Sequence, residues 1–287
     1  MKKNRIKNIV FLLLFMSAIV IPLTQNNKDM AKRADMQTPQ SDNSSAKVPI
    51  IMYHKVSKNT AALGKFTISP QEFENDLKFL EKNGYTTVLI ADLIDYVNGQ
   101  RELPEKPVVL TFDDGNFSDF LYVYPLLKEY NMKAVFSIIG KPTDDYSEEG
   151  RTDITYPHLI WPQITLMIES GLIEIQNHSY DLHGANGSYK LSKESAQQYK
   201  TRFRNDIYKM QVRTNQITGL SPTTFTYPLG KISKESYEVL SDLGFLSSLT
   251  CYEGNNVIIK EQPQCLFLLN RCIRPHGKPV ARVLGAI

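Results

Sequence analysis

Cysteine is scarce in this sequence, and its few thiols are confined to the C-terminal region. They are Cys251, Cys265 and Cys272, and no CxxC motif occurs, which excludes a zinc ribbon. We interpret them as free, buried thiols. One disulfide in an oxidising compartment is the alternative, and it leaves one thiol unpaired.

The chain also carries little net charge once its first residues are set aside. The formal charge is +3, but four of the 33 basic residues lie within residues 1–7, and residues 1–25 contain no acid. Without these four, 29 basic residues face 30 acidic ones. A nearly neutral body lacks the basic face that nucleic-acid binding requires, so we expect no nucleic-acid partner.

Residues 1–25 join a basic start to a 15-residue apolar run at 9–23, which is the form of a secretory signal. The run is shorter than the roughly 20 residues of a membrane-spanning helix. It lacks an A-x-A cleavage site, so a retained anchor is the alternative. Residues 26–47 are polar and aperiodic and predict a linker, which leaves 48–287 as a single domain. We therefore expect a secreted, monomeric protein that associates with the cell surface, at the membrane or the cell wall.

From Val48 onward, short β-rich runs alternate with helical patterns. The predicted strands are 48–53, 85–90, 107–112, 133–139, 172–176, 223–227, 245–250 and 266–271. Ser69-Pro70-Gln71-Glu72 predicts a capped helix start, 117–130 a helix despite Pro125, and 140–158 a loop. Such alternation predicts an α/β protein with parallel strands and crossover helices, and seven or eight units favour a distorted (β/α)7–8 barrel.

Polar side chains follow four of the predicted strands. His54 ends the first, Asp113-Asp114-Gly115 follows 107–112, His178 follows 172–176, and Tyr227-Pro228 ends 223–227. In barrels, active sites gather at the carboxyl ends of the strands. The sequence therefore predicts that these side chains share one rim.

Two histidines and a carboxylate form a set that binds Zn²⁺, Fe²⁺, Ni²⁺ or Co²⁺ and leaves coordination positions open. His178 and His183 are five residues apart, so they do not share a helical face and must lie on a loop. Asp113 and Asp114 cannot face the same way at a strand end. One of them can hold the metal while the other acts as general base on water, whose pKa such a metal lowers to roughly 7.

Three segments together resemble the first motifs of the polysaccharide deacetylases, carbohydrate esterase family 4. They are TFDDG (111–115), NHSYDLH (177–183) and TYPLG (226–230). The resemblance extends over roughly residues 48–275. It implies a NodB-type distorted barrel, one divalent metal ion, with zinc favoured over cobalt, nickel or iron, and hydrolysis of N-acetyl groups on a polysaccharide.

The resemblance also implies roles for individual residues. It makes Asp113 the general base and places the metal on Asp114, His178 and His183. Asp181, between the two histidines, is interpreted either as a residue that orients a ligand or as part of an Asx turn. His158 is interpreted as structural or solvated.

Amide hydrolysis must expel an amine, which leaves well only when protonated, and a histidine can donate that proton near neutral pH. By the resemblance His54 supplies it, with His276 as the alternative acid. The metal and a backbone N–H near Tyr227 are expected to stabilise the oxyanion.

One feature departs from the family pattern. The third motif usually carries an arginine that orients the base, and 226–229 has none, which puts the support of the base in doubt. The histidine spacing and the MYH at 52–54 are similar to the poly-β-1,6-N-acetyl-D-glucosamine deacetylases of biofilm formation. We therefore expect that extracellular polymer as substrate. A deacetylase of chitin oligomers or peptidoglycan, and a weakly catalytic polysaccharide-binding surface protein, are the alternatives.

Overall fold

The computed structural model describes residues 44–149 and 157–285. The predicted leader at 1–25 and most of the predicted linker lie outside this part. Strand β1 (Ser45–Lys47) pairs antiparallel with β11 (Val257–Ile259), so the folded domain begins before the predicted boundary at Val48. Within the two described ranges, no helix has both the length and the apolarity that a membrane crossing requires.

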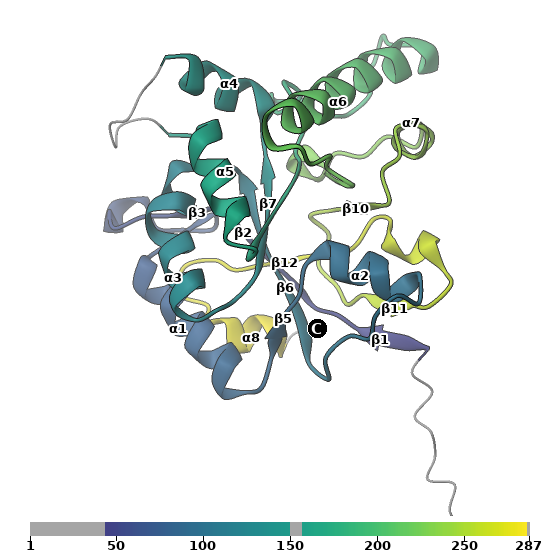
Figure 1. Ribbon diagram of the computed structural model, residues 1–287. Coiled ribbons are helices and arrows are strands. Elements are labelled where there is room, and N and C mark those ends of the chain that lie inside the picture. Colours follow the sequence, from purple (N-terminus) through teal and green to yellow (C-terminus); the bar gives the residue numbers. More distant parts are fainter. Residues whose placement is uncertain (1–43, 150–156, 286–287) are drawn as a thin grey trace, which may run out of the picture. The chain divides into compact units, whose positions relative to one another are not determined.

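A parallel sheet forms the centre of the domain (Figure 1). Its strands are β2 (Ile50–Tyr53), β5 (Thr86–Thr87), β6 (Pro107–Asp114), β7 (Ala134–Ile138), β8 (Ile173–Asn177), β9 (Thr224–Thr226), β10 (Ser247–Leu249) and β12 (Cys272–Ile273). The spatial order is β10-β9-β8-β7-β6-β2-β12, and β5 pairs with the start of β6. This strongly curled sheet confirms the predicted distorted barrel.

The last stretch of chain spans the two sides of the curl. Leu269 forms a parallel bridge with Leu249 of β10, and Cys272 pairs with Ile51 of β2. Arg271, one of the two residues between these contacts, is therefore enclosed by the sheet. The predicted last strand, 266–271, is displaced: Pro263–Leu266 is a 3₁₀ helix and pairing with β2 begins only at Cys272.

Helices cover the outside of the sheet. They are α1 (Pro70–Lys82), α2 (Ile90–Val97), α3 (Tyr124–Glu129), α4 (Gly140–Glu148), α5 (Trp161–Glu169), α6 (Ala196–Thr218), α7 (Ser236–Asp242) and α8 (Val280–Leu284). The predicted capping box starts α1: Ser69 Oγ accepts from the Glu72 N–H, and Glu72 accepts from the Ser69 N–H. Helices α1, α3 and α5 lie on the same side of the sheet (Figure 1). Their buried side chains share one apolar cluster with the strands.

Two helical predictions need correction. The π-helical turn Asp119–Val123 precedes α3, because Pro125 lacks an N–H and its ring crowds the carbonyl four residues earlier, which widens that turn. The predicted loop at 140–158 contains α4 instead, which begins directly after β7.

Strand β6 divides its side chains between the two faces of the sheet. Val108, Leu110 and Phe112 pack into the cluster beneath α1 and α3. Val109 joins the second cluster, together with Val135 and Leu249 from neighbouring strands. Because successive side chains alternate, the face of Val109 also carries Thr111 and then Asp113. Along this face, the strand therefore carries an apolar side chain near its start and polar side chains at its end.

A buried ion pair fastens the C-terminal segment to α1. The Arg274 guanidinium donates to Asp76 from Nε (2.7 Å) and Nη2 (3.2 Å), and both side chains are almost fully buried. Asp76 also accepts from the Tyr53 hydroxyl (3.2 Å) and the Val280 N–H (3.1 Å). The segment that brings Arg271 into the barrel is therefore held by a satisfied polar network.

We predict that Asp76→Ala lowers the free energy of unfolding by about 3–5 kcal/mol, because it leaves the Arg274 guanidinium buried without its carboxylate. Urea denaturation measures this change. Glu74→Ala on the same helix is the matched control, since Glu74 pairs with Lys78 at the surface, and we expect no change outside experimental error. Equal stability of the two variants would contradict the role of the pair.

Candidate active site

The turn after β6 separates the two tandem aspartates. Asp114 adopts φ 76° and Gly115 φ 71°, both in the left-handed region. A Cβ at Gly115 would approach Ile138 Cγ2 to 2.9 Å, so only glycine fits there. The reversal directs Asp113 into the barrel and Asp114 to the rim, as expected from alternation at a strand end.

Asp114, His178 and His183 come together at the rim. One ligand atom from each lies within 4.8 Å of the others. Asp114 Oδ1 is 3.1 Å from His183 Nε2 and 3.5 Å from His178 Nε2. Among the described residues, this buried oxygen has no hydrogen-bond donor. A carboxylate oxygen and two imidazole nitrogens that converge in this way fit a divalent cation.

Hydrogen bonding and charge prepare these groups for a cation. His178 Nδ1–H donates to the Thr226 carbonyl at 2.8 Å, which leaves Nε2 free toward Asp114. Burial opposes ionisation of Asp114, but the imidazoles of His178 and His183 outweigh it and hold its pKa well below the ordinary value. Burial likewise opposes charge on His183, yet the Asp114 carboxylate raises its pKa.

Asp113 is held by an arginine that sequence reasoning missed. Arg271 Nη1 and Nη2 each donate to one Asp113 oxygen at 2.7 Å, and both side chains are fully buried. Arg271 Nε donates to the Thr250 carbonyl at 2.7 Å. Burial raises the pKa of Asp113, but the guanidinium outweighs this and keeps it below the usual range. The arginine absent from 226–229 is thus replaced from the far end of the chain, which removes the doubt about how the base is supported.

Only one of the two histidines proposed as the acid lies beside the base. His54 Nε2 is 3.9 Å from Asp113 Oδ2, and its ring lines the same cavity. Burial lowers the pKa of His54, although Asp113 and Asp114 raise it in opposition, so its imidazolium is a stronger acid than a free one. His276 instead lies over the start of α1, with Nδ1 2.8 Å from Glu72.

The structure contradicts the expectation for Tyr227. Its N–H donates to the Leu249 carbonyl at 3.0 Å, and its buried hydroxyl bonds Ser236 at 2.7 Å. The residue continues the sheet and packs into a core cluster, so neither group faces the rim. Leu229, two residues later, lines the cavity with φ 57°.

Two further predictions concern residues around the ligands. The Asp181 side chain is exposed. The His158 ring stacks on Tyr146 and its Nδ1 contacts the Asp114 carbonyl at 3.3 Å, which agrees with a structural role. All three cysteines are free, as interpreted, but only Cys272 is buried, whereas Cys251 and Cys265 are partly exposed. Cys251 lies near Arg271.

The site opens into a cavity of about 570 Å³. Besides the residues above, its lining includes Lys55, Lys65, Phe66, Asn116, Glu253 and Ile273. Asn116 Nδ2 donates to the His54 and Asp113 carbonyls (3.3 and 3.2 Å), which ties the ends of β2 and β6 together. The cavity thus brings together the Asp113 carboxylate, the His54 imidazole and the Asp114-His178-His183 set, with room for a sugar.

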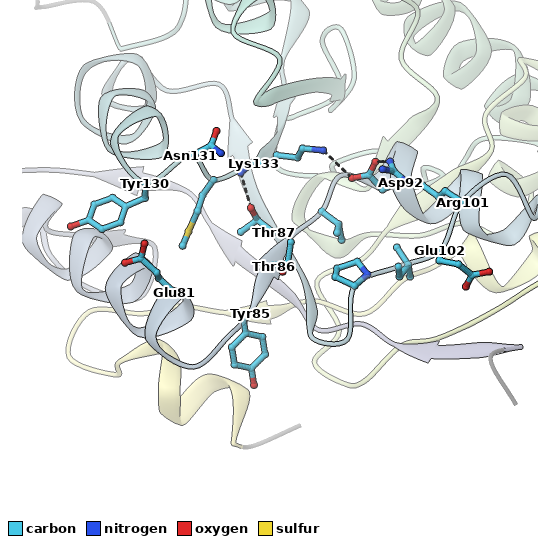
Figure 2. A pocket seen from close by; sticks show the side chains of 14 residues that line it. Glu81, Tyr85, Thr86, Thr87, Asp92, Arg101, Glu102, Tyr130, Asn131 and Lys133 are labelled. Carbon is cyan, nitrogen blue, oxygen red and sulfur yellow. Dashed lines mark hydrogen bonds and ion pairs between the residues drawn. The ribbon is translucent and has the colours of Figure 1, made fainter. Parts of the chain in front are cut away.

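A larger cavity, of about 670 Å³, lies near the amino ends of β6 and β7 (Figure 2). Three of its charged groups pair with one another, since Arg101 and Lys133 both contact Asp92. Thr87 also accepts from the Lys133 N–H. Among the described residues, no buried polar atom that lacks a partner belongs to its lining. This end of a barrel contributes stability rather than chemistry.

We predict that the protein binds one Zn²⁺ per chain and that His183→Ala weakens this binding. Loss of a residue that only supports a metal ligand costs about 10- to 100-fold in affinity, and we expect loss of a ligand to cost at least as much. Isothermal titration calorimetry measures the affinity, and thermal unfolding provides a second readout, since an ion at 100 times Kd stabilises by about 2.7 kcal/mol. His276→Ala, remote from the three ligands, is the control. Unchanged Zn²⁺ affinity in His183→Ala would exclude this residue as a ligand.

Comparison with known proteins adds family evidence to this geometry. Residues 100–247 match the family model described as polysaccharide deacetylase. The chain is 26% identical to the poly-β-1,6-N-acetyl-D-glucosamine N-deacetylase of Escherichia coli over 81% of this chain and 38% of that protein. It is 23% identical to the enzyme of the same name from Staphylococcus aureus, over 82% of this chain and 83% of that one.

A solved structure matches as well. IcaB from Ammonifex degensii is 26% identical, with a TM-score of 0.65 over 80% of this chain and 92% of that one. On the family match over more than half of its length, the chain belongs to the polysaccharide deacetylase family of hydrolases.

Proposed function

We propose that this deacetylase removes N-acetyl groups from extracellular poly-β-1,6-N-acetyl-D-glucosamine, with zinc as its metal. One observation carries the proposal: Asp113, locked by Arg271, lies between a metal-ligand set and His54 in one open cavity. A base, an acid and a Lewis-acid site within a few ångströms are the parts that amide hydrolysis needs.

Each side chain has a separate task in this reaction. Asp114, His178 and His183 would hold a divalent ion, which would supply Lewis acidity toward the acetyl carbonyl and water. The Asp113 carboxylate accepts a proton from the attacking water. His54 delivers a proton to the sugar nitrogen as the C–N bond breaks, which releases acetate and leaves a free amine. Leu229, on the rim, is the residue whose backbone N–H we assign to the oxyanion in place of Tyr227.

The relatives support the choice of polymer. The E. coli and S. aureus proteins are both named for poly-β-1,6-N-acetyl-D-glucosamine. Deacetylation of such a polymer creates positive charge, which favours its retention on an anionic cell surface and supports biofilm formation. The basic and apolar residues 1–25 support export to the surface, where this polymer is found.

Acetate release from purified β-1,6-linked N-acetylglucosamine oligomers tests the proposal. We expect release that depends on added divalent metal and is lost in Asp113→Asn, which keeps the size of the side chain but not its basicity. Chitin oligomers and peptidoglycan are the comparison substrates. Faster release from either would replace the proposed polymer. No release from any substrate by metal-loaded protein would favour the polysaccharide-binding alternative.

We predict that Arg271→Lys lowers kcat by about 10- to 100-fold, because lysine cannot hold both oxygens of Asp113. The pH profile gives a second readout. Arg271 lowers the pKa of Asp113, and a base must be ionised, so weakening this contact moves the acidic limb of the profile to higher pH. Arg101→Lys, in an Arg–Asp pair lining the other cavity, is the control. An unshifted acidic limb in Arg271→Lys would argue against Asp113 as the base.

A further inference from the structure

The loop that carries both histidine ligands is clamped from outside the site. Between His178 and His183, the N–H groups of Tyr180 and Asp181 donate to the two carboxylate oxygens of Asp206, at 2.7 and 2.8 Å. Asp206 lies on α6, the long helix labelled in Figure 1. A single carboxylate therefore fixes two successive amides midway between the ligands.

The two ligands differ in how they are otherwise held. His178 is buried, its N–H donates to the Ile138 carbonyl at 3.1 Å, and its ring is oriented by Thr226. The His183 side chain is 26% exposed. Its ring lies 3.1 Å from the Asp114 carboxylate and 4.8 Å, between ring centroids, from His178, and both of these residues belong to the same ligand set. The position of His183 therefore depends on the backbone of the loop.

Several contacts make α6 a rigid support for this loop. Asn177 Nδ2 donates to the Ile207 carbonyl at 3.1 Å, and Lys209 Nζ lies 3.7 Å from the centre of the Tyr180 ring. The Tyr180 hydroxyl donates to Asp144 at 3.1 Å. Asp206 thus acts within a packed junction. The Leu182 N–H donates to Ser179 Oγ within the loop at 3.1 Å, whereas the Tyr180 and Asp181 N–H groups are held from α6 by Asp206.

We propose that Asp206 is a positioning residue that sets the metal affinity of the site by fixing the backbone that presents His183. The inference rests on the proposed metal-dependent function. Ligands that are placed before the ion arrives lose less conformational freedom on binding, so the clamp strengthens binding without touching the ion. Without the two hydrogen bonds to Asp206, the loop between the ligands samples other conformations, and His183 is the ligand that moves out of the metal site.

Zn²⁺ titration of the purified full chain, with competing chelator, tests the proposal. Asp206→Asn is close in size to aspartate, but it replaces one acceptor with an amide donor that faces a backbone N–H. We expect about a 10-fold or greater loss of Zn²⁺ affinity. Asp181→Asn is the matched control, because it removes the same charge from an exposed side chain nearer the ligands. We expect its affinity to stay within 2-fold of wild type.

A double-mutant cycle then identifies the ligand through which Asp206 acts. If the clamp works through His183, Asp206→Asn causes little further loss in a His183→Ala background. The visible spectrum of the Co²⁺-loaded protein gives an independent signature, since Asp206→Asn should change the coordination while Asp181→Asn does not.

The outcomes separate the two proposals. Failure of the wild type to bind any divalent metal would overturn the proposed function. Metal binding by the wild type together with unchanged affinity in folded Asp206→Asn, or fully additive losses with His183→Ala, would overturn the role of Asp206. If circular dichroism shows that Asp206→Asn is unfolded, Asp206→Glu keeps the charge while displacing the carboxylate, and the same affinity criterion applies to it.

Discussion

The buried pair of Arg271 and Asp113 is the interaction on which the site depends. Two parallel hydrogen bonds at 2.7 Å join β6 to the segment that crosses from β10 to β2. Burying these charges is costly, and the geometry must satisfy every donor to offset that cost. Thr250 accepts from Nε, Thr111 from Nη1 and Cys251 Sγ from Nη2 at 3.8 Å, which completes the set of five donors. The segment that bridges β10 and β2 therefore keeps Asp113 ionised through Arg271, and the same ion pair holds that segment in place.

A second constraint is backbone conformation at the end of β6. Asp114 occupies a left-handed conformation that costs a non-glycine residue about 1–2 kcal/mol. Glycine alone fits at the next position, against Ile138. The rest of the fold offsets this cost. The conformation directs two adjacent carboxylates to different places, Asp113 inside the barrel and Asp114 at its rim. A straight strand would have sent Asp114 to the helical side.

The sequence predicted the parts of the site that lie at strand ends, because strand alternation and barrel topology bring such residues together without any knowledge of side-chain packing. His54, Asp113, Asp114 and His178 belong to this class, whereas His183 lies on the loop beyond β8 and was predicted from the motif resemblance. It did not predict Arg271, although an arginine in an apolar run signals a buried acidic partner. It misjudged Tyr227 because a single register position decides whether a residue faces the core or the rim. Asp206 was out of reach, since a helix residue that binds loop amides leaves no local pattern.

The order of strands in space, rather than along the chain, explains why an acid from the first strand and an arginine from the last segment meet. β2 lies between β6 and β12, so the chain ends are neighbours beside the strand that bears the base. In a curled parallel sheet, any strand end on the rim can supply a proton donor, provided that its neighbour holds the base. Asn116 fixes this relation by bonding the carbonyls of both His54 and Asp113. The site thus depends on which strands are neighbours in the sheet, and the order of the motifs along the chain matters less.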